Sequence, residues 1–458
     1  MANDDELRSM LGEPHAAIRR MVIPFLISII VVQINVFTDT FWVSGLGIDA
    51  VSGMTTAVPL YSVFANIAVG LSVGAVATMA YRLGAGDRDG ASHLAGNAIV
   101  YGVMLAVVSS VTIIVLLDPV VDLMGADDVR REVFDYTLPL IILSPSVVLN
   151  TVFGGLLRAE GNAKRSTTVQ MSAAIFNMVL DPILIYGLGM GLMGAGLATA
   201  LSSCFGLAIA VRWYLAGRTA VPIRRSDLSL KRAVGTELMT VAAPRTLEGL
   251  TMTVTILFQR VFIIMASGTP GVSLFNVPFR YVNLSMCPSE ATGMAMVPVA
   301  AASYGQKDLA KMKDAMTYAF KLSMGFAAVL TVALFVFSGP LIGLFTLDPS
   351  MDEWRDAFTW NMMMYSIILP FFSIQTMGSS FLQAMKRSKR PMEVTMIVGF
   401  IRMGLFCIAS AYDYRAITYA LIISYVISAA LMISVAAHEF KVLERKAAAE
   451  RASRPSIH

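Results

Sequence analysis

The chain has 458 residues, of which 56% are hydrophobic and only 14% are charged, and its mean hydropathy is +0.68. A soluble protein of this length carries about a quarter charged residues, so the composition excludes an ordinary soluble domain and indicates a polytopic membrane protein. The three cysteines fall in apolar segments far apart in sequence, so neither a disulfide framework nor a zinc site is expected.

Apolar runs of roughly 20 residues, the length that crosses a bilayer as a helix, recur along the whole chain. Residues 1–20 contain four acidic residues and no apolar region with a small-residue cleavage site, so no cleavable signal is expected. We predict twelve spans, at residues 21–43, 54–81, 92–117, 133–157, 167–187, 192–213, 236–266, 274–303, 314–345, 357–384, 392–411 and 415–437.

Lysine and arginine concentrate in alternate loops. The loops after the second, fourth, sixth, eighth and tenth spans each carry two to five of them, whereas the other loops have few. By the positive-inside rule, these loops and both termini are expected to lie on the cytoplasmic side. The expected location of the protein is the cell (plasma) membrane. The net charge of +4 therefore reflects the placement of basic residues in the cytoplasmic loops, and no nucleic-acid partner is expected.

The two halves of the chain resemble each other. Residues 144–166 (SPSVVLNTVFGGLLRAEGNAKRS) align with residues 369–391 (LPFFSIQTMGSSFLQAMKRSKRP) at an offset of 225, which pairs Pro145 with Pro370. Because each half has six spans, both halves run in the same direction, which predicts two pseudo-symmetric six-helix lobes related by an axis along the membrane normal. The expected parts are an N-terminal lobe with a cation site (1–213), a cytoplasmic connector (214–235) and a C-terminal lobe with a cytoplasmic tail (236–458).

Polar residues interrupt the fifth predicted span. Asn177 and Asp181 are four residues apart and share a helical face, and Pro182 removes the helical partner of a nearby carbonyl. Asp39 of the first span and Thr199 of the sixth add a carboxylate and a hydroxyl. These oxygens suit Na⁺ and can equally hold a proton. Each aspartate costs about 2.5–3.5 kcal/mol at the middle of a membrane, and a coupling ion is the expected compensation.

The acidic pair belongs to the first half only. The positions that align with Asn177, Asp181 and Asp39 hold Arg402, Phe406 and Gln259. A fixed positive charge therefore replaces one member of the set in the second lobe. We predict a single cation site, in the N-terminal lobe.

At these residues the sequence resembles the multidrug and toxic compound extrusion (MATE) family. The resemblance covers nearly the whole chain and is carried by PFLISIIVVQINVFTDTFWVSGLG (24–47), LRAEGNAKRS (157–166), NMVLDPILIYGLGMGLMGAGLAT (177–199) and YGQKD (304–308). It points to the DinF-like branch. The resemblance implies the twelve-helix MATE fold, a cation-coupling site at Asp39, Asn177, Asp181 and Thr199, and a bend of the first helix at Pro24. The NorM-like branch has an acidic cluster in the second lobe, but here the tenth span offers only Gln375.

Other polar residues within the spans are weaker candidates for a substrate cavity. Glu248 either pairs with Arg245 three residues earlier or marks a second-lobe cation site. Glu290 either is functional or pairs with Arg260 or Arg280. Arg402 either satisfies helix carbonyls or an acid, or contacts substrate. The cavity candidates are Gln33, Asn150, Glu248, Glu290 and Arg402.

The expected function is a secondary antiporter that exports amphipathic or cationic organic compounds in exchange for Na⁺ or H⁺ by alternating access of the two lobes. The alternative is a flippase for a lipid-linked precursor, which should have more cationic residues along its central cavity. The chain contains no HExxH motif and no GxxxxGK[ST] loop, so neither a membrane-embedded enzyme nor an ATP-driven pump is expected. We expect a monomer without a cofactor that handles small organic substrates within membrane lipid.

Overall fold

The computed structural model describes residues 2–123, 127–343 and 354–452, and these residues form helices and short connections with no strand among them. The end of the ninth predicted span (344–345) and the last six residues of the tail (453–458) lie outside the described residues. The helices are α1 (Ala2–Leu11), α2 (Pro14–Ser44), α3 (Ile48–Gly84), α4 (Arg88–Leu123), α5 (Arg130–Ile142), α6 (Ser144–Ala159), α7 (Ala163–Pro182), α8 (Gly191–Leu215), α9 (Arg232–Gly305), α10 (Leu309–Val336), α11 (Ser338–Gly343), α12 (Arg355–Ser366), α13 (Ile368–Ala384), α14 (Lys389–Ala409) and α15 (Tyr414–Ala452), with 3₁₀ turns η1 (Asp127–Val129) and η3 (Arg225–Leu228) and a π-helix η2 (Ile183–Gly187).

The predicted all-α membrane fold is confirmed. Among the described residues, ten helical segments are long and apolar enough to span a membrane, and the bent pair α5–α6 makes an eleventh. The return half of α9, which corresponds to the predicted span 274–303, is not one of these segments. It contains Glu290, serines and several prolines, which lower its mean hydropathy.

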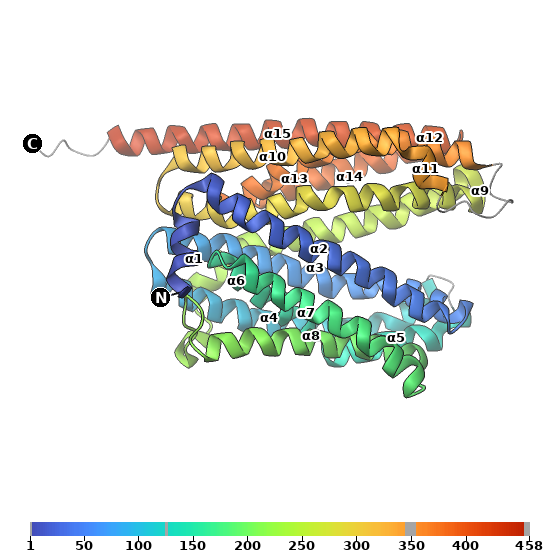
Figure 1. Ribbon diagram of the computed structural model, residues 1–458, viewed down its shortest axis with the longest axis horizontal. Helices are drawn as coiled ribbons and strands as arrows, with labels where there is room; N and C mark the ends of the chain where they lie inside the picture. The colour runs from blue at the N-terminus through green and yellow to red at the C-terminus, as the bar shows by residue number, and fades with distance from the viewer. Residues whose placement is uncertain (1, 124–126, 344–353, 453–458) are drawn as a thin grey trace, which may run out of the picture.

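Helix α9 contains two of the predicted spans. Its backbone leaves the helical region only at Ser267 and Gly268, where the φ of Gly268 is +63°. Glu237 binds Arg82 at the end of α3, and Ala302 packs on Gly84 of the same turn. The two halves of α9 therefore run side by side in opposite directions, as Figure 1 shows.

The predicted fourth span is broken into α5 and α6, which meet at an angle of 58°. Pro145 lies at the start of α6 and has no N–H to donate to the Ile141 carbonyl. The Ser110 hydroxyl donates to that carbonyl instead, at 3.0 Å, and contacts the Ser144 hydroxyl at 2.6 Å. A polar side chain from α4 thus compensates the break.

The ends of the chain are more helical than the sequence predicts. Helix α1 precedes the first span, and α15 continues well beyond the predicted end at residue 437. Both termini lie at the same end of the bundle, which we call the terminal end; the opposite end is the far end (Figure 1).

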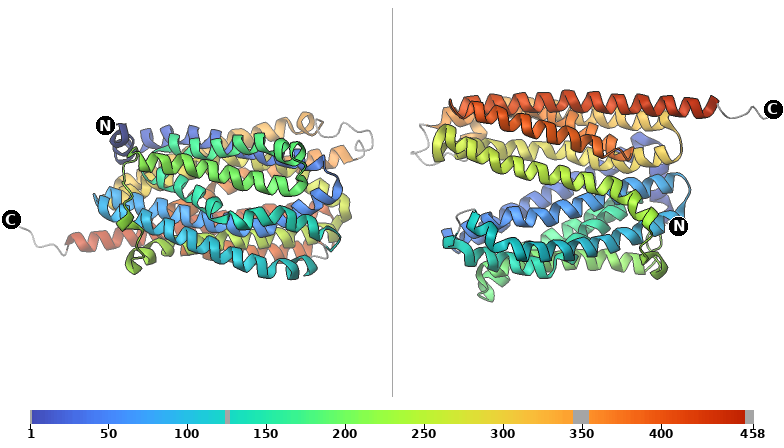
Figure 2. Two further views of the ribbon diagram at one scale, coloured as in Figure 1. Left: turned by 90° about the horizontal axis from the view of Figure 1, so that it is seen from below. Right: turned by 180° about the vertical axis from the view of Figure 1, so that it is seen from behind.

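The two lobes share one hydrophobic core at the terminal end and have separate cores at the far end. The shared core combines Ala68–Leu83 of α3 with Ala291–Ala302 of α9. One far-end core belongs to the N-terminal half, around Phe64 and Tyr136, and the other to the C-terminal half, around Phe275 and Tyr365. Figure 2 shows the same arrangement, with the lobes meeting at the terminal end and diverging toward the far end.

Small residues bring the lobes together at the terminal end. A Cβ at Gly70 would lie 2.0 Å from Thr246 Oγ1, and a Cβ at Gly74 would lie 2.9 Å from the Cβ of Ala242, so only glycine allows this approach of α3 and α9. Residues 70–74 (GLSVG) happen to match the hydrolase pattern GxSxG. They lie within a helix rather than on a strand-to-helix turn, so this match does not indicate a nucleophile.

An ion-pair network also joins the lobes there. The Glu237 carboxylate of α9 accepts from Arg82 Nε of α3 at 3.1 Å and from Lys386 Nζ at 2.7 Å. The Lys386 ammonium also lies 3.4 Å from the ring centroid of Tyr81. Burial lowers the pKa of Lys386, and the Glu237 carboxylate opposes that change.

Candidate functional site

Two aspartates face each other inside the N-terminal lobe. Asp181 is fully buried at the end of α7, and Asp39 lies on α2, five residues before the helix ends at Ser44. Their carboxyl groups interact directly. The structure therefore brings together the two acids predicted from the sequence.

A pair of asparagines holds Asp181. Asn177 Nδ2 donates to Asp181 Oδ1 at 3.3 Å, and Asn177 Oδ1 accepts a short hydrogen bond from Asn35 Nδ2. In this state Asn177 orients the carboxylate, because its own oxygen is engaged by Asn35. The sequence analysis missed Asn35, although its position four residues before Asp39 on an apolar helix was a signal.

Thr199 of α8 joins the site through a tyrosine. Its hydroxyl donates to the Ala195 carbonyl at 3.2 Å and is in hydrogen-bonding contact with the Tyr136 phenol. Tyr136 and Tyr61 both lie within electrostatic reach of Asp39. Neither tyrosine could be assigned from the sequence, because each comes from a different helix and lies among other apolar residues.

Pro182 ends α7 and is followed directly by the π-helix η2. A π-helix shifts the helical hydrogen-bond register and is frequent at functional sites. The backbone beside Asp181 therefore departs from α-helical hydrogen bonding, through this π-helix. Pro24, by contrast, lies within α2, which continues as one helix from Pro14 to Ser44.

The decisive property of the site is its unsatisfied oxygens. Asp39 Oδ1 and Asp181 Oδ2 are both buried, and neither has a hydrogen-bond donor among the described residues. A buried carboxylate oxygen without a donor is costly, and either a bound cation or a shared proton removes the cost. Within the described residues no cluster of three His, Cys, Asp or Glu side chains forms a metal centre.

Comparison with known proteins identifies the family of the chain. The sequence model of the MatE family matches residues 24–183 and 244–408. This chain belongs to the MatE family.

Among its relatives, an FAD transporter of Shewanella oneidensis is 24% identical over 399 residues, which cover 85% of this chain and 86% of the relative. The multidrug export protein MepA of Staphylococcus aureus (strain N315) is 23% identical over 407 residues and 88% of each chain. The crystal structure of a MATE protein in complex with MaL6 superposes with a TM-score of 0.91 at 26% identity, covering 96% of this chain and 99% of that chain.

The C-terminal lobe of this MatE protein fills the equivalent place with its own cation. Arg402, the counterpart of Asn177, donates from Nε to Ser424 Oγ at 2.9 Å and lies 4.7 Å from the ring centroid of Tyr425. Ser424 stands 225 residues after Thr199, so Arg402 binds the counterpart of Thr199 in the second lobe. Its partners are therefore a hydroxyl and an aromatic ring of its own lobe, rather than the helix carbonyls or acid expected from the sequence.

Two other acids of the C-terminal lobe have partners. Glu248 is buried, lies 3.5 Å from Arg245 Nη1 and accepts from the Ser379 hydroxyl at 3.2 Å. The predicted alternative of a local ion pair is therefore present. Glu290 is exposed, and its charged neighbour is Arg245 rather than Arg260 or Arg280.

The remaining candidates lie in the N-terminal lobe. Asn150 packs inside it, where its Oδ1 has no hydrogen-bond donor among the described residues and faces Gly206 of α8. Gln33 is half-buried on α2, two residues before Asn35. Asn150 and Gln33 are thus placed in the lobe that contains the acidic pair.

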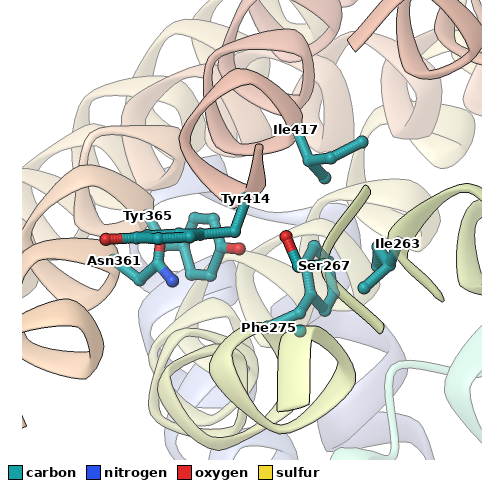
Figure 3. A pocket seen from close by; sticks show the side chains of 8 residues that line it. Ile263, Ser267, Phe275, Asn361, Tyr365, Tyr414 and Ile417 are labelled. Carbon is teal, nitrogen blue, oxygen red and sulfur yellow. The ribbon is translucent and has the colours of Figure 1, made fainter. Parts of the chain in front are cut away.

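A small cavity of about 10 Å³, enough for a single water, lies at the far end of the C-terminal lobe (Figure 3). Its Asn361 amide is satisfied within the protein. Asn361 Nδ2 donates to the Leu274 carbonyl at 3.1 Å, and Asn361 Oδ1 accepts from the Thr418 hydroxyl at 2.8 Å. The cavity therefore does not share the unsatisfied oxygens of the acidic pair.

Proposed function

We propose that this MatE transporter is a secondary antiporter that exports amphipathic or cationic organic compounds in exchange for Na⁺ or H⁺. The observation that carries the proposal is the pair of buried oxygens, Asp39 Oδ1 and Asp181 Oδ2, that face each other without donors among the described residues. A site that is costly when empty and stable when it holds a cation has the property that coupling requires.

The coupling set is Asp39, Asn177, Asp181 and Thr199. The two carboxylates supply the charge, Thr199 supplies a hydroxyl, and Asn177 either orients Asp181 or rotates its oxygen toward the ion. Pro182 interrupts the backbone hydrogen bonds of α7 beside Asp181, and Pro24 does so in α2 about four turns before Asp39, which lets both helices adjust. The acidic pair in the first lobe also supports placement in the DinF-like branch.

Alternating access is supported by the division of the core. The lobes are joined at the terminal end by a shared core and by the Glu237 network, and they are separate at the far end. We propose that the terminal end is cytoplasmic, with both termini inside and the protein a monomer in the plasma membrane. In this arrangement the described state opens outward.

The relatives support export of organic compounds, because one is a multidrug export protein and another is an FAD transporter. No cofactor is proposed, since the ion gradient supplies the energy. The flippase alternative has one observation in its favour, the exposed arginines Arg260 and Arg280 on α9.

The test is transport by purified protein in liposomes, without ATP, under an imposed Na⁺ or H⁺ gradient. Efflux of trapped ethidium or FAD should follow one of the gradients in the wild type. The variant Asp181→Asn should fall to the level of protein-free liposomes, because it removes one charge of the coupling pair. Phe406→Leu, at the counterpart position of the second lobe, is the matched control and should retain most of the flux. Equal losses in both variants would contradict the proposal.

A further inference from the structure

Two arginines of α9 lie on the side of the C-terminal lobe that faces the N-terminal lobe. On the first half of α9, Gly249 and Thr253 face α3, because a Cβ at Gly249 would meet Asn66 and the Asn66 amide donates to Thr253 at 3.3 Å. Arg260 follows Thr253 by about two helical turns and therefore continues the same face toward the far end. Its side chain is exposed.

Arg280 reaches the same region from the second half of α9. Its guanidinium lies 5.7 Å from the ring centroid of Phe37 on α2, which is a contact between the two lobes. Gly305, which packs on the Tyr81 carbonyl of α3, is about seven turns further along the same face. Arg280 is exposed as well, so the diverging lobes leave it accessible.

Neither arginine has an acidic partner within the described part of the chain. The two acids in the interior of α9, Glu248 and Glu290, both neighbour Arg245 instead. The positive charges of Arg260 and Arg280 are therefore uncompensated on the surface between the lobes. An unpaired arginine at membrane depth is unfavourable, and such residues are usually retained for a ligand or an ion path.

The surroundings indicate the kind of ligand. A guanidinium offers planar, paired donors that match a phosphate or carboxylate. Phe37 and Phe41 are four residues apart on one face of α2, and their side chains are 52% and 67% exposed. Measured along the helix axis from the break at Ser267 and Gly268, Arg260 lies about 10 Å away on the first half of α9, and Arg280 lies about 18 Å away on the second half. The two cations are thus staggered along the surface next to aromatic rings.

We propose that Arg260 and Arg280 bind the phosphate of an anionic amphipathic substrate whose aromatic or apolar part packs on Phe37 and Phe41. This inference rests on the proposed transport function and selects, from its amphipathic or cationic substrates, the amphipathic compounds that carry a phosphate. The phosphate can belong to a water-soluble dinucleotide or to a lipid-linked precursor, and both present the same chemistry to the arginines.

The test is equilibrium binding to the purified full-length protein in detergent. FAD is compared with riboflavin, which has the same flavin ring but lacks the phosphates and the adenosine, and a polyprenyl phosphate is compared with the matching polyprenol. In at least one pair, the phosphate compound should bind tenfold or more tightly than its neutral partner. Preference within the FAD pair identifies a soluble substrate, and preference within the polyprenyl pair identifies a lipid. No preference in either pair overturns the proposal.

Variants tie the preference to the two arginines. Arg260→Gln and Arg280→Gln should each weaken binding of the preferred phosphate at least tenfold and leave its neutral partner unchanged, whereas Arg280→Lys should retain part of the affinity. Arg415→Gln, at an exposed arginine of α15 that stacks on Trp360, is the control. An equal loss in Arg415→Gln, or none in the other variants, contradicts the assignment. Asp181→Asn should bind phosphate normally, so a failure of ion coupling is distinguishable from a failure of this inference.

Discussion

The N-terminal and C-terminal lobes carry opposite charges at equivalent helix positions. In the first lobe, Asn177 on α7 lies beside the acids Asp39 and Asp181, each of which has one buried oxygen without a hydrogen-bond donor among the described residues. In the second lobe the equivalent position holds Arg402, whose guanidinium binds Ser424 and Tyr425. Under the proposed function, one lobe has a replaceable cation and the other a permanent one.

This difference teaches how a duplicated fold acquires an asymmetric function. Under the proposed function, the permanent cation would make its lobe insensitive to the ion gradient, because no ion has to bind or leave. The replaceable cation would make the stability of its lobe depend on the ion concentration. Only one lobe would then respond to the gradient, and the other would serve as its fixed partner during alternating access.

The largest expected effect concerns a carboxyl that the second lobe lacks. Glu160 follows α6 and is buried, and its counterpart in the second lobe is Met385. The Glu160 carboxylate accepts hydrogen bonds from the Ala220 amide at 2.8 Å and from the Tyr214 hydroxyl at 3.1 Å. Burial raises the pKa of Glu160 from 4.5 to about 7. Because the folded protein binds the proton more tightly, the stability that this proton contributes is complete below pH 4.5 and is lost as the pH rises to about 7.

The size of this effect is about 3 kcal/mol, since each pKa unit corresponds to about 1.4 kcal/mol. Melting temperatures of the wild type in detergent should therefore fall between pH 5 and pH 7, relative to Glu160→Gln, which resembles the protonated form at every pH. Met385→Leu should retain the pH dependence of the wild type. Parallel melting curves for the wild type and Glu160→Gln would show that Glu160 does not titrate in this range.

The second effect tests the replaceable cation directly. If the acidic pair holds Na⁺, a hundredfold excess over Kd should stabilise the protein by about 2.7 kcal/mol, and K⁺ should do so poorly because it is larger. Asp181→Asn should lose this stabilisation in a thermal melt. If the wild type responds to pH but not to Na⁺, and Asp181→Asn to neither, the coupling ion is a proton. Identical responses of the wild type and Asp181→Asn would mean that the acids are structural.

The third effect tests the permanent cation. Arg402→Leu removes a charged hydrogen bond and a cation–π contact, and should destabilise the protein by about 1–2 kcal/mol. The Na⁺-dependent rise in melting temperature should remain, because the ion binds in the other lobe. Loss of the Na⁺ response in Arg402→Leu would show that the two sites are not independent.

The sequence was sufficient for the helical membrane fold, because long apolar runs have few alternatives in a bilayer. It also identified Asp39 and Asp181, since charged residues stand out in such runs. It could not reveal Tyr136, whose role depends on helices far apart in sequence. The 58° bend between α5 and α6 was also missed, because a span of ordinary length conceals a break that Ser110 compensates from another helix.

The smallest effect compares two turns at the terminal end. Gly86 and Lys307 occupy equivalent positions after α3 and α9, and both have a left-handed backbone, with φ of +80° and +59°. A left-handed conformation costs a residue with a side chain about 1–2 kcal/mol, whereas glycine adopts it freely but loses more entropy on folding. Lys307→Gly should therefore stabilise the protein by about 0.5–1 kcal/mol, measured by denaturant or thermal unfolding in detergent. Gly86→Ala should destabilise it by a similar amount, since a Cβ there meets no atom within 4 Å and only the backbone is strained.

Lys386→Gly should not stabilise the protein, although the φ of Lys386 is also +59°, because its ammonium binds Glu237. Stabilisation by Lys386→Gly equal to that by Lys307→Gly would show that the ion pair between the lobes contributes nothing to the folded state.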